Sequence, residues 1–455
     1  MARPVDNIDK GTAVRGPVLT TSRDDFMKRE AKRREIFYQQ PGDRGPITKL
    51  LMQLGHEAPE NRWYFYWPEQ RFNPMLGDVK DVYTDAALSS AYSGGAAKED
   101  DTVYLALTRE DAEGIIENEQ LLIIEPGDDK KQVMLDVGHV NVATDDSSYA
   151  VCRLMEDDDS VLDQDNITWR QASIAMAEMS GLPDPTHEDP VWSKNYMQIL
   201  MASIEASNSE LAEEGAEEVN ESLLTRKEAQ ALNKMQTYME RAILWGRMTL
   251  KNQNGRRRST MGGIYKALSD HDSDLIFNYK TSADYNDTTW VNGGWDWFQD
   301  VITRTSLFSQ AEKFVWTGDL ALRSINTLCE ELGDIHMEPN YNEQWGINVN
   351  TLRGVSTTLH FYQHPLFSHD TALRRQALVF EPSLFRLVPL AGRGGVRDLR
   401  PVTRDEAQDM GYRSENGHTW VDGFKSGWLT EFSMRWNNLD ACAWMKGIGE
   451  DNPNT

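Results

Sequence analysis

A single apolar stripe runs through the segment from Thr225 to Lys251, and it is the most continuous helical pattern in the chain. Apolar residues recur there at spacings of three and four, which places them on one face of a helix. They are Ala229, Leu232, Met235, Met239, Ala242, Ile243 and Gly246. At about 1.5 Å per residue this helix would span roughly 40 Å, enough to support a whole domain.

Both ends of this helix carry sequence signals. Thr225 and Glu228 have the spacing of a capping box, which satisfies exposed amide donors at a helix start, and the polar run from Asn252 to Gly255 marks the end. Glu240 falls with the polar side chains. The pattern therefore predicts one buried face that packs against a sheet of the same subunit, consisting of Leu232, Met235, Met239 and Ile243.

The chain before this helix alternates between polar and β-rich sections. Residues 1–45 have no apolar face wide enough for a domain, and a short apolar helix and an aromatic strand follow them. From Asp78 to about Met155, short apolar runs are separated by turn residues, which predicts strands. Among the turns, Ser93, Gly94, Gly95, Ala96 and Ala97 have the composition of a solvent-reaching hairpin tip that contacts something outside its own domain.

The rest of the chain predicts an acidic insertion and a mixed α/β section. Residues 156–190 are acidic and interrupted by prolines, and a strand begins near Val191. Alternating strand and helix patterns then occupy residues 262–390, within the usual size of a domain. The C-terminal segment from Ser426 to Ile448 predicts a strand pair that closes a sheet.

Composition narrows the classes of function. The 455 residues include 47 Lys and Arg against 72 Asp and Glu, a formal net charge of -25, which disfavours general binding to nucleic acid or to an anionic membrane. No apolar run has the length of a membrane span or of a signal core, so we expect a cytosolic chain without a membrane partner. Cys152, Cys329 and Cys442 lack paired spacing and are expected to be buried small hydrophobic residues.

Candidate chemical sites are weak in this sequence. The run Glu156 to Asp159 lacks the spacing of a calcium loop, and His360, His364 and His369 lack zinc-binding spacing. Gly262 and Gly263 are expected to form a turn where two backbones approach. The tryptophans Trp290, Trp295 and Trp297 are expected to be core or interface anchors. We therefore expect no catalytic residue, cofactor or metal.

The order of these parts resembles the major capsid proteins of tailed bacteriophages, which have the Hong Kong 97-type fold, and most closely a subfamily of short-tailed phages. The residues that carry the resemblance are Asn195, Tyr196, Gln198 and Ile199, the helix Glu228 to Gly246, the turn Met261 to Ile264, and Leu429, Thr430 and Glu431. The motifs are short, so the resemblance depends on their order over residues 47–448.

This resemblance implies an α+β fold with a defined domain order. It implies an N-terminal arm (1–45), its connection to the peripheral domain (46–74), an extended β-hairpin loop (75–105), a β-rich section with the acidic insertion (106–190), a peripheral domain with a long spine helix (191–261), an axial α/β domain (262–390) and C-terminal peripheral-domain strands (391–455). No Lys and Asn pair for covalent cross-linking can be assigned, so a cross-linked shell is not expected.

The resemblance also implies partners and location. It implies copies of the chain in hexamers and pentamers, a portal protein, a scaffold during assembly, a cement protein as an optional addition, and packaged double-stranded DNA bound without sequence specificity. The implied location is the virion head shell, with assembly in the host cytoplasm. The loop residues 93–97 and a basic cluster in the arm are expected to contact neighbouring subunits, the cluster consisting of Lys28, Arg29, Lys32, Arg33 and Arg34.

Two other functions stay open at this point. The tryptophans and the many acids also fit an intracellular carbohydrate-active enzyme, in which aromatic rings stack on sugars. A scaffold or tail-tube protein of a phage is the third interpretation.

Overall fold

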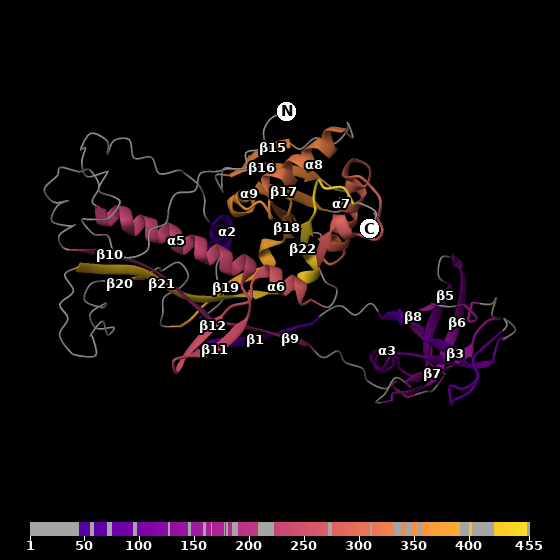
Figure 1. Ribbon diagram of the computed structural model, residues 1–455. Helices are drawn as coiled ribbons and strands as arrows, with labels where there is room; N and C mark the ends of the chain where they lie inside the picture. The colour runs from indigo at the N-terminus through magenta and orange to yellow at the C-terminus, as the bar shows by residue number, and fades with distance from the viewer. Residues whose placement is uncertain are drawn as a thin grey trace. The chain divides into compact units, whose positions relative to one another are not determined.

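The structure is a computed structural model in which the chain forms two compact units. Unit 1 comprises Met1–Glu69 and Trp192–Thr455, and unit 2 comprises Gln70–Val191. The structure describes residues 45–54, 59–70, 75–93, 98–125, 128–143, 147–157, 161–164, 166–176, 178, 181–183, 190–207, 223–271, 275–309, 312–331, 338–342, 347–353, 357–391, 400–402 and 423–452. The predicted α+β class is confirmed, because both units contain sheets and the described helices cover parts of them (Figure 1).

Unit 2 is inserted into unit 1 between two paired strands. The chain leaves unit 1 at the end of β1 (Tyr64–Glu69) and returns at β9 (Val191–Tyr196), and these two strands form a sheet of their own. The entry and exit points of unit 2 therefore lie side by side.

The predicted long helix is α5 (Leu223–Trp245), whose 23 residues correspond to roughly 35 Å. Met235, Met239 and Ile243 have no exposed surface. Leu232, expected in the same core, is only partly buried, because Ala231 occupies that edge of the buried stripe. Glu240, expected on the polar face, is completely buried.

The helix ends at Trp245, six residues before the predicted end at Lys251. The backbone of the turn that contains Met261 and Gly263 passes close to this end of the helix. A Cβ atom on Gly246 would lie 2.4 Å from the carbonyl oxygen of Ala242 and 2.6 Å from that of Met261. A Cβ on Gly263 would lie 2.5 Å from the amide nitrogen of Gly246. Only glycine fits at both positions, and the expectation that the glycine pair lets two backbones approach is confirmed.

The residues after the helix form a two-stranded antiparallel ribbon of β11 (Thr249–Gln253) and β12 (Arg256–Thr260). Asn254 and Gly255 join the strands with φ angles of 52° and 73°, the left-handed conformation of a tight hairpin turn. This Asn-Gly turn overrides the helical pattern that predicted a longer helix. At the other end, α5 begins at Leu223, so Thr225 lies inside the helix and is not its cap.

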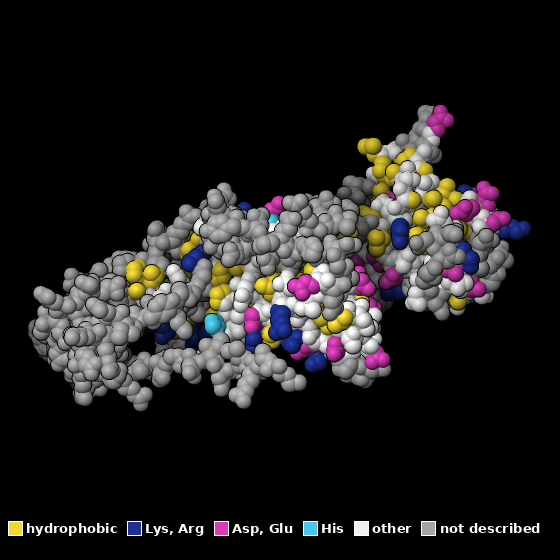
Figure 2. Space-filling view, turned by 90° about the horizontal axis from the view of Figure 1, so that it is seen from above, with side chains coloured by type: hydrophobic (Ala, Val, Ile, Leu, Met, Phe, Trp, Pro, Cys, Tyr) yellow, Lys and Arg dark blue, Asp and Glu magenta, His cyan; other side chains and the backbone are white. Residues whose placement is uncertain are grey.

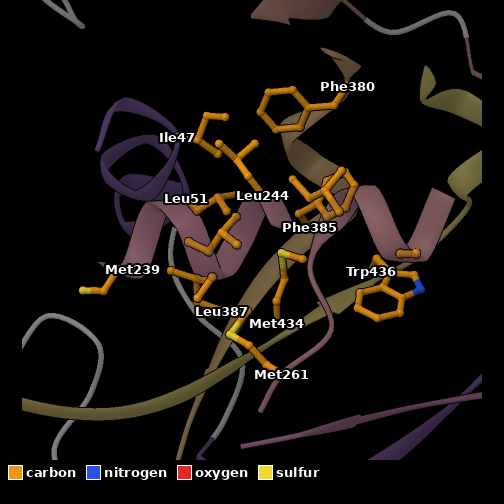
Figure 3. Close-up of a cluster of buried hydrophobic side chains, with 14 of the residues drawn as sticks. Ile47, Leu51, Met239, Leu244, Met261, Phe380, Phe385, Leu387, Met434 and Trp436 are labelled. Carbon is orange, nitrogen blue, oxygen red and sulfur yellow. The ribbon is translucent and has the colours of Figure 1, made fainter. Parts of the chain in front are cut away.

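A four-stranded sheet packs against α5. In it, β10 and β19 both pair with β21 in an antiparallel arrangement, and β20 also pairs with β21. The strands are β10 (Gln198–Ser207), β21 (Gly423–Trp436), β19 (Phe385–Pro389) and β20 (Arg400–Val402). The short helix α2 (Pro46–Leu54) also packs on α5, and Figure 3 shows Ile47 and Leu51 of α2 in one cluster with Leu244, Leu387 and Met434.

A seven-stranded mixed sheet forms the rest of unit 1. Its strands, in spatial order, are β13 (Ile276–Asn278), β22 (Ala443–Lys446), β18 (Ala377–Phe380), β14 (Lys313–Thr317), β17 (Thr358–Gln363), β16 (Ile347–Arg353) and β15 (Glu338–Asn342). The accompanying helices are α6 (Ile264–Ser269), α7 (Trp290–Leu307), α8 (Asp319–Glu331), α9 (Pro365–His369) and the single turns η2 (Tyr279–Thr281), η3 (Pro382–Leu384) and η4 (Leu439–Ala441).

Both faces of this sheet are buried, and successive residues alternate between two cores. Trp316 and Trp444 join the core around α5, whereas their neighbours Val315 and Met445 join a second core with α7 and α8. The sheet therefore connects the helix α5 with the outer helices.

The prediction that the C-terminal segment forms a pair of neighbouring strands is wrong. β21 lies in the four-stranded sheet, and β22 pairs with β13 and β18 of the seven-stranded sheet. Between them, Asn438 adopts the left-handed conformation, with φ of 45°, immediately before the turn η4. The chain thus passes from the four-stranded sheet to the seven-stranded sheet, and its C-terminal segment contributes one strand to each.

Unit 2 is an antiparallel sheet of seven strands with its own core. In spatial order the strands are β2 (Leu76–Asp78), β8 (Thr168–Ile174), β5 (Glu119–Glu125), β6 (Asp128–Asn141), β7 (Tyr149–Leu154), β4 (Thr102–Ala106) and β3 (Asp81–Tyr83). A short helix α3 (Arg109–Gly114) begins after Thr108, whose hydroxyl accepts a hydrogen bond from the amide of Asp111. Segments 75–105 and 106–190, expected as separate parts, share this sheet.

We predict that Met239→Ala lowers the free energy of unfolding of unit 1 by about 2 to 5 kcal/mol, because a completely buried side chain is lost and a cavity is left. Lys234→Ala on the exposed side of α5 should change it by only about half a kcal/mol. Chemical denaturation of dissociated subunits measures both. Equal losses for the two variants would contradict the burial of this helix within the subunit.

Candidate functional site

Unit 1 is held together at a carboxylate that has no exposed surface, that of Glu240 on α5. One oxygen, Oε1, accepts a hydrogen bond of 3.1 Å from the amide of Ile47, and Oε2 accepts from the amide and the hydroxyl of Thr48 at 2.8 and 2.5 Å. These donors lie in the first turn of α2, which has no acidic residue of its own there. Glu240 thus caps a helix that is 192 residues distant in the sequence.

His364 supplies a fourth hydrogen bond to this carboxylate. Its Nε2 lies 2.7 Å from Oε1 of Glu240, and both side chains are fully buried. Its Nδ1 accepts a hydrogen bond of 3.2 Å from the amide of Leu366 in the first turn of α9, so Nε2 carries the proton and donates to Glu240. The imidazole therefore links the start of α9 to α5.

A second buried polar side chain, Asn195 at the end of β9, joins two other segments, the glycine turn at Gly262 and β21. Its amide nitrogen donates to the carbonyl oxygens of Met434 at 2.8 Å and Gly262 at 3.2 Å. Its Oδ1 accepts from the amides of Gly262 and Tyr196, both at 2.8 Å. All four hydrogen-bonding positions of the side-chain amide are used.

The residues that carried the family resemblance meet at this point. Besides the bonds of Asn195 to the glycine turn, Oε1 of Gln198 accepts a hydrogen bond of 3.1 Å from the amide of Met261. Glu431 of β21 is 2% exposed and lies 3.8 Å from the guanidinium of Arg257. Short motifs from three distant parts of the chain thus form one structural junction.

Both junctions position structure and leave no room for chemistry on a substrate. The oxygens of Glu240 accept four hydrogen bonds from the protein. The side-chain amide of Asn195 donates two hydrogen bonds and accepts two, all with protein groups. Buried polar groups satisfied this fully specify one arrangement of the segments that they join. We refer to the Glu240, His364 and Thr48 side chains as the carboxylate junction.

The predicted contact residues fall largely outside the described part of the chain. The basic cluster Lys28 to Arg34 and the loop residues Gly94 to Ala97 lie outside the described residues. Ser93 is exposed in the connection between β3 and β4 of unit 2. Their assignment to contacts between subunits stays a prediction.

The sequence did not reveal the carboxylate junction. Glu240 follows Met239 and precedes Ala242 and Ile243, all buried, so its position borders the apolar stripe. A charged residue at that edge is a signal for a buried partner, but nothing in the sequence identifies that partner as Thr48 or His364.

Other candidates for chemistry are accounted for by packing. Trp290 and Trp297 are buried together against Tyr279, with ring centroids 5.0 and 5.6 Å from its ring, so they cannot form a sugar-stacking platform. Glu156 accepts a hydrogen bond from the amide of Met134, and Asp157 accepts one from that of Glu99. Within the residues that the structure describes, no cluster of His, Cys, Asp and Glu could hold a metal ion.

The three cysteines are buried and unpaired in disulfides, as expected from their spacing. Burial raises the pKa of the Cys152 and Cys329 thiols, and that of Cys442 to about 12. Thiols with such pKa values are protonated at neutral pH and unreactive. Among the helices that the structure describes, none has the length and apolar composition needed to cross a membrane.

Comparison with known proteins gives one family match. The model of the family described as "SU10 major capsid protein" matches residues 19–449. No curated protein matches the chain. Similar solved structures include those titled "Mycobacterium phage Adephagia" (11% identity, 82% of this chain and 97% of that chain, TM-score 0.35) and "Mycobacterium phage Cain" (11%, 81% and 96%, 0.34), and the holo-SrpI encapsulin complex of Synechococcus elongatus (10%, 58% and 77%, 0.37).

We predict that Glu240→Gln lowers the free energy of unfolding of unit 1 by about 1 to 3 kcal/mol, because the amide nitrogen of glutamine cannot accept a hydrogen bond and leaves buried donors without their acceptor. The matched control is Glu330→Gln on the exposed side of α8, which should change it by less than about half a kcal/mol. Chemical denaturation measures both, and hydrogen exchange at the amides of Ile47 and Thr48 reports whether α2 has lost its cap. Equal stability of the two variants would contradict the structural role of the carboxylate junction.

Proposed function

Because this chain belongs to the SU10 major capsid protein family, whose model matches residues 19–449, we propose that it assembles into the hexamers and pentamers of a closed head shell around the double-stranded DNA of a tailed bacteriophage. The family assignment confirms the resemblance drawn from the order of the sequence motifs. The chain is a capsid protein that forms a shell, and it acts in the virion.

The single observation that carries this proposal is the family match over nearly the whole chain. The architecture supports it physically. A shell subunit must keep its shape while neighbours press on it, and unit 1 has two sheets joined by a continuous core around α5 and by fully satisfied buried polar groups. Such a subunit transmits contact forces without local unfolding.

The finer parts of the proposal concern the roles of the segments. We assign the spine helix to α5, the axial domain to the seven-stranded sheet with its helices, and the extended loop to residues 75–105, which include the connection between β3 and β4. The arm would contact acidic surface on neighbours through its basic cluster, Lys28, Arg29, Lys32, Arg33 and Arg34. A portal protein, a scaffold and a cement protein would be partners of the assembling shell, which forms in the host cytoplasm without catalysis by this chain.

Negative-stain microscopy of the purified full chain over a range of concentrations tests the proposal. Closed shells or rings of five and six subunits are the expected result, and their fraction should rise with protein concentration because assembly is an association reaction. Monodisperse monomers at every concentration, together with hydrolysis of glycoside substrates, would overturn it.

A further inference from the structure

The ribbon β11–β12 is an exposed element with two different faces. Successive residues of a strand point to opposite sides, so Arg257 and Ser259 share one face and Arg256 and Arg258 share the other. In the antiparallel register, Lys251 lies directly opposite Arg258, and Gln253 lies opposite Arg256. Every residue from 251 to 258 is exposed.

The face with Arg257 holds the ribbon on unit 1. The guanidinium of Arg257 lies over the ring of Trp63, 4.7 Å from its centroid, and 3.8 Å from the carboxylate of Glu431. The hydroxyl of Ser259 donates a hydrogen bond of 2.6 Å to the carbonyl oxygen of Met197. One face of the ribbon is therefore committed to contacts within the subunit.

The opposite face, which we call the cationic face, carries Lys251, Arg256 and Arg258. Arg258 donates a hydrogen bond of 3.3 Å to Gln253, and no described carboxylate lies within ion-pair distance of these three side chains. The sequence contains no Asp or Glu from Arg241 to Ser269. Like charges placed directly opposite each other destabilise a pair of strands, so the cationic face costs stability in the isolated subunit.

The negative charge of the chain is concentrated in unit 2. Residues 70–191 contain 27 Asp and Glu against 8 Lys and Arg, a formal charge of -19 out of the total of -25. Figure 2 shows acidic side chains spread over the visible face of this unit. In contrast, the residues of unit 1 contribute only -6 although they are far more numerous.

Part of this charge lies at one corner of unit 2, where β7 ends and β4 begins. The amide of Asp100 donates to the carbonyl oxygen of Leu154, and the amide of Leu154 donates to that of Asp101, which fixes the two chain segments together. Arg153 pairs with Asp100 at 2.9 Å, which leaves most of the charge uncompensated. The acidic corner consists of the exposed residues Glu99, Asp100, Asp101, Glu156 and Asp157.

We propose that the cationic face of one subunit binds the acidic corner of unit 2 in a neighbouring copy of the chain. The inference rests on the proposed function, because a shell brings many copies together in a repeated geometry. Complementary charge favours this partner, and such pairing mainly determines which surfaces meet and how fast they associate. Double-stranded DNA is the less favoured partner, because three cations can make only a few of the phosphate contacts that sustain binding, and unit 1 as a whole has a net negative charge.

Three chains test this contact. The first carries K251E, R256E and R258E on the cationic face, the second carries E99K, D100K and E156K at the acidic corner, and the third carries all six changes. A matched control carries K194E, R241E and R323E, which change the net charge as much as the first set at other exposed sites of unit 1. Circular dichroism and thermal unfolding establish that each chain folds, and light scattering and microscopy measure assembly.

We expect each three-residue set to reduce the yield of assembled rings and shells at least about tenfold, and the chain with all six changes to recover it, because opposite charges again face each other. A mixture of the first two chains should associate better than either alone, since each then offers the surface that the other lacks. The matched control should assemble like the original chain, and assembly of the original chain should weaken as salt screens the charges.

Four results would overturn the inference while leaving the proposed function intact, provided that the original chain forms shells. The first is normal shells from the first chain, and the second is no recovery of assembly in the chain with all six changes. The third is recovery of assembly in that chain but not in the mixture of the first two, which would place the contact within one subunit. The fourth is impaired assembly of the matched control. Normal shells from the first chain that have lost binding to double-stranded DNA would assign the ribbon to DNA instead. An original chain that forms no shells would refute the proposed function itself.

Discussion

The burial of the Glu240 carboxylate is the constraint on which unit 1 depends. Removing a carboxylate from water costs several kcal/mol, and this cost is offset only when its oxygens are fully hydrogen-bonded. Here the donors come from the first turn of α2 and from His364 before α9. Each of these segments must therefore be in place when α5 packs, so the carboxylate links folding of the N-terminal helix to that of the seven-stranded sheet.

The other described charged groups of the chain are mostly exposed, and the two signs are concentrated on different parts of the molecule. Unit 2 carries most of the net charge of the chain, and the ribbon that follows α5 carries a cationic face in a segment without acids. Acidic surfaces repel each other and keep free subunits soluble. A family of shell-forming proteins needs both properties, solubility before assembly and specific attraction between defined surfaces during it.

The sequence predicts the parts of this fold that depend on local patterns. The period of the apolar residues identified α5, short apolar runs between turn residues identified the strands of unit 2 between residues 78 and 155, and the glycine pair identified the close approach of Gly246 and Gly263. The predicted end of α5 is wrong, because Asn254 and Gly255, which belong to the polar run that marks a helix terminus in the sequence, form a hairpin turn. The carboxylate junction could not be predicted, because its partners are separated by more than a hundred residues and only the tertiary fold brings them together. The sheet membership of β22 was missed for the same reason.

The most direct test compares hydrogen exchange of the backbone amides in dissociated subunits and in assembled particles. It shows whether unit 1 is already fully folded before assembly and whether charged surfaces make the contacts between subunits. The account predicts that the amides of Ile47 and Thr48 are equally protected in both states, because Glu240 caps α2 within each subunit. It predicts that amides of the ribbon β11–β12 and of residues 98–101 gain protection only in the particles. Protection of Ile47 and Thr48 that arises only on assembly, with an unchanged ribbon, would contradict it.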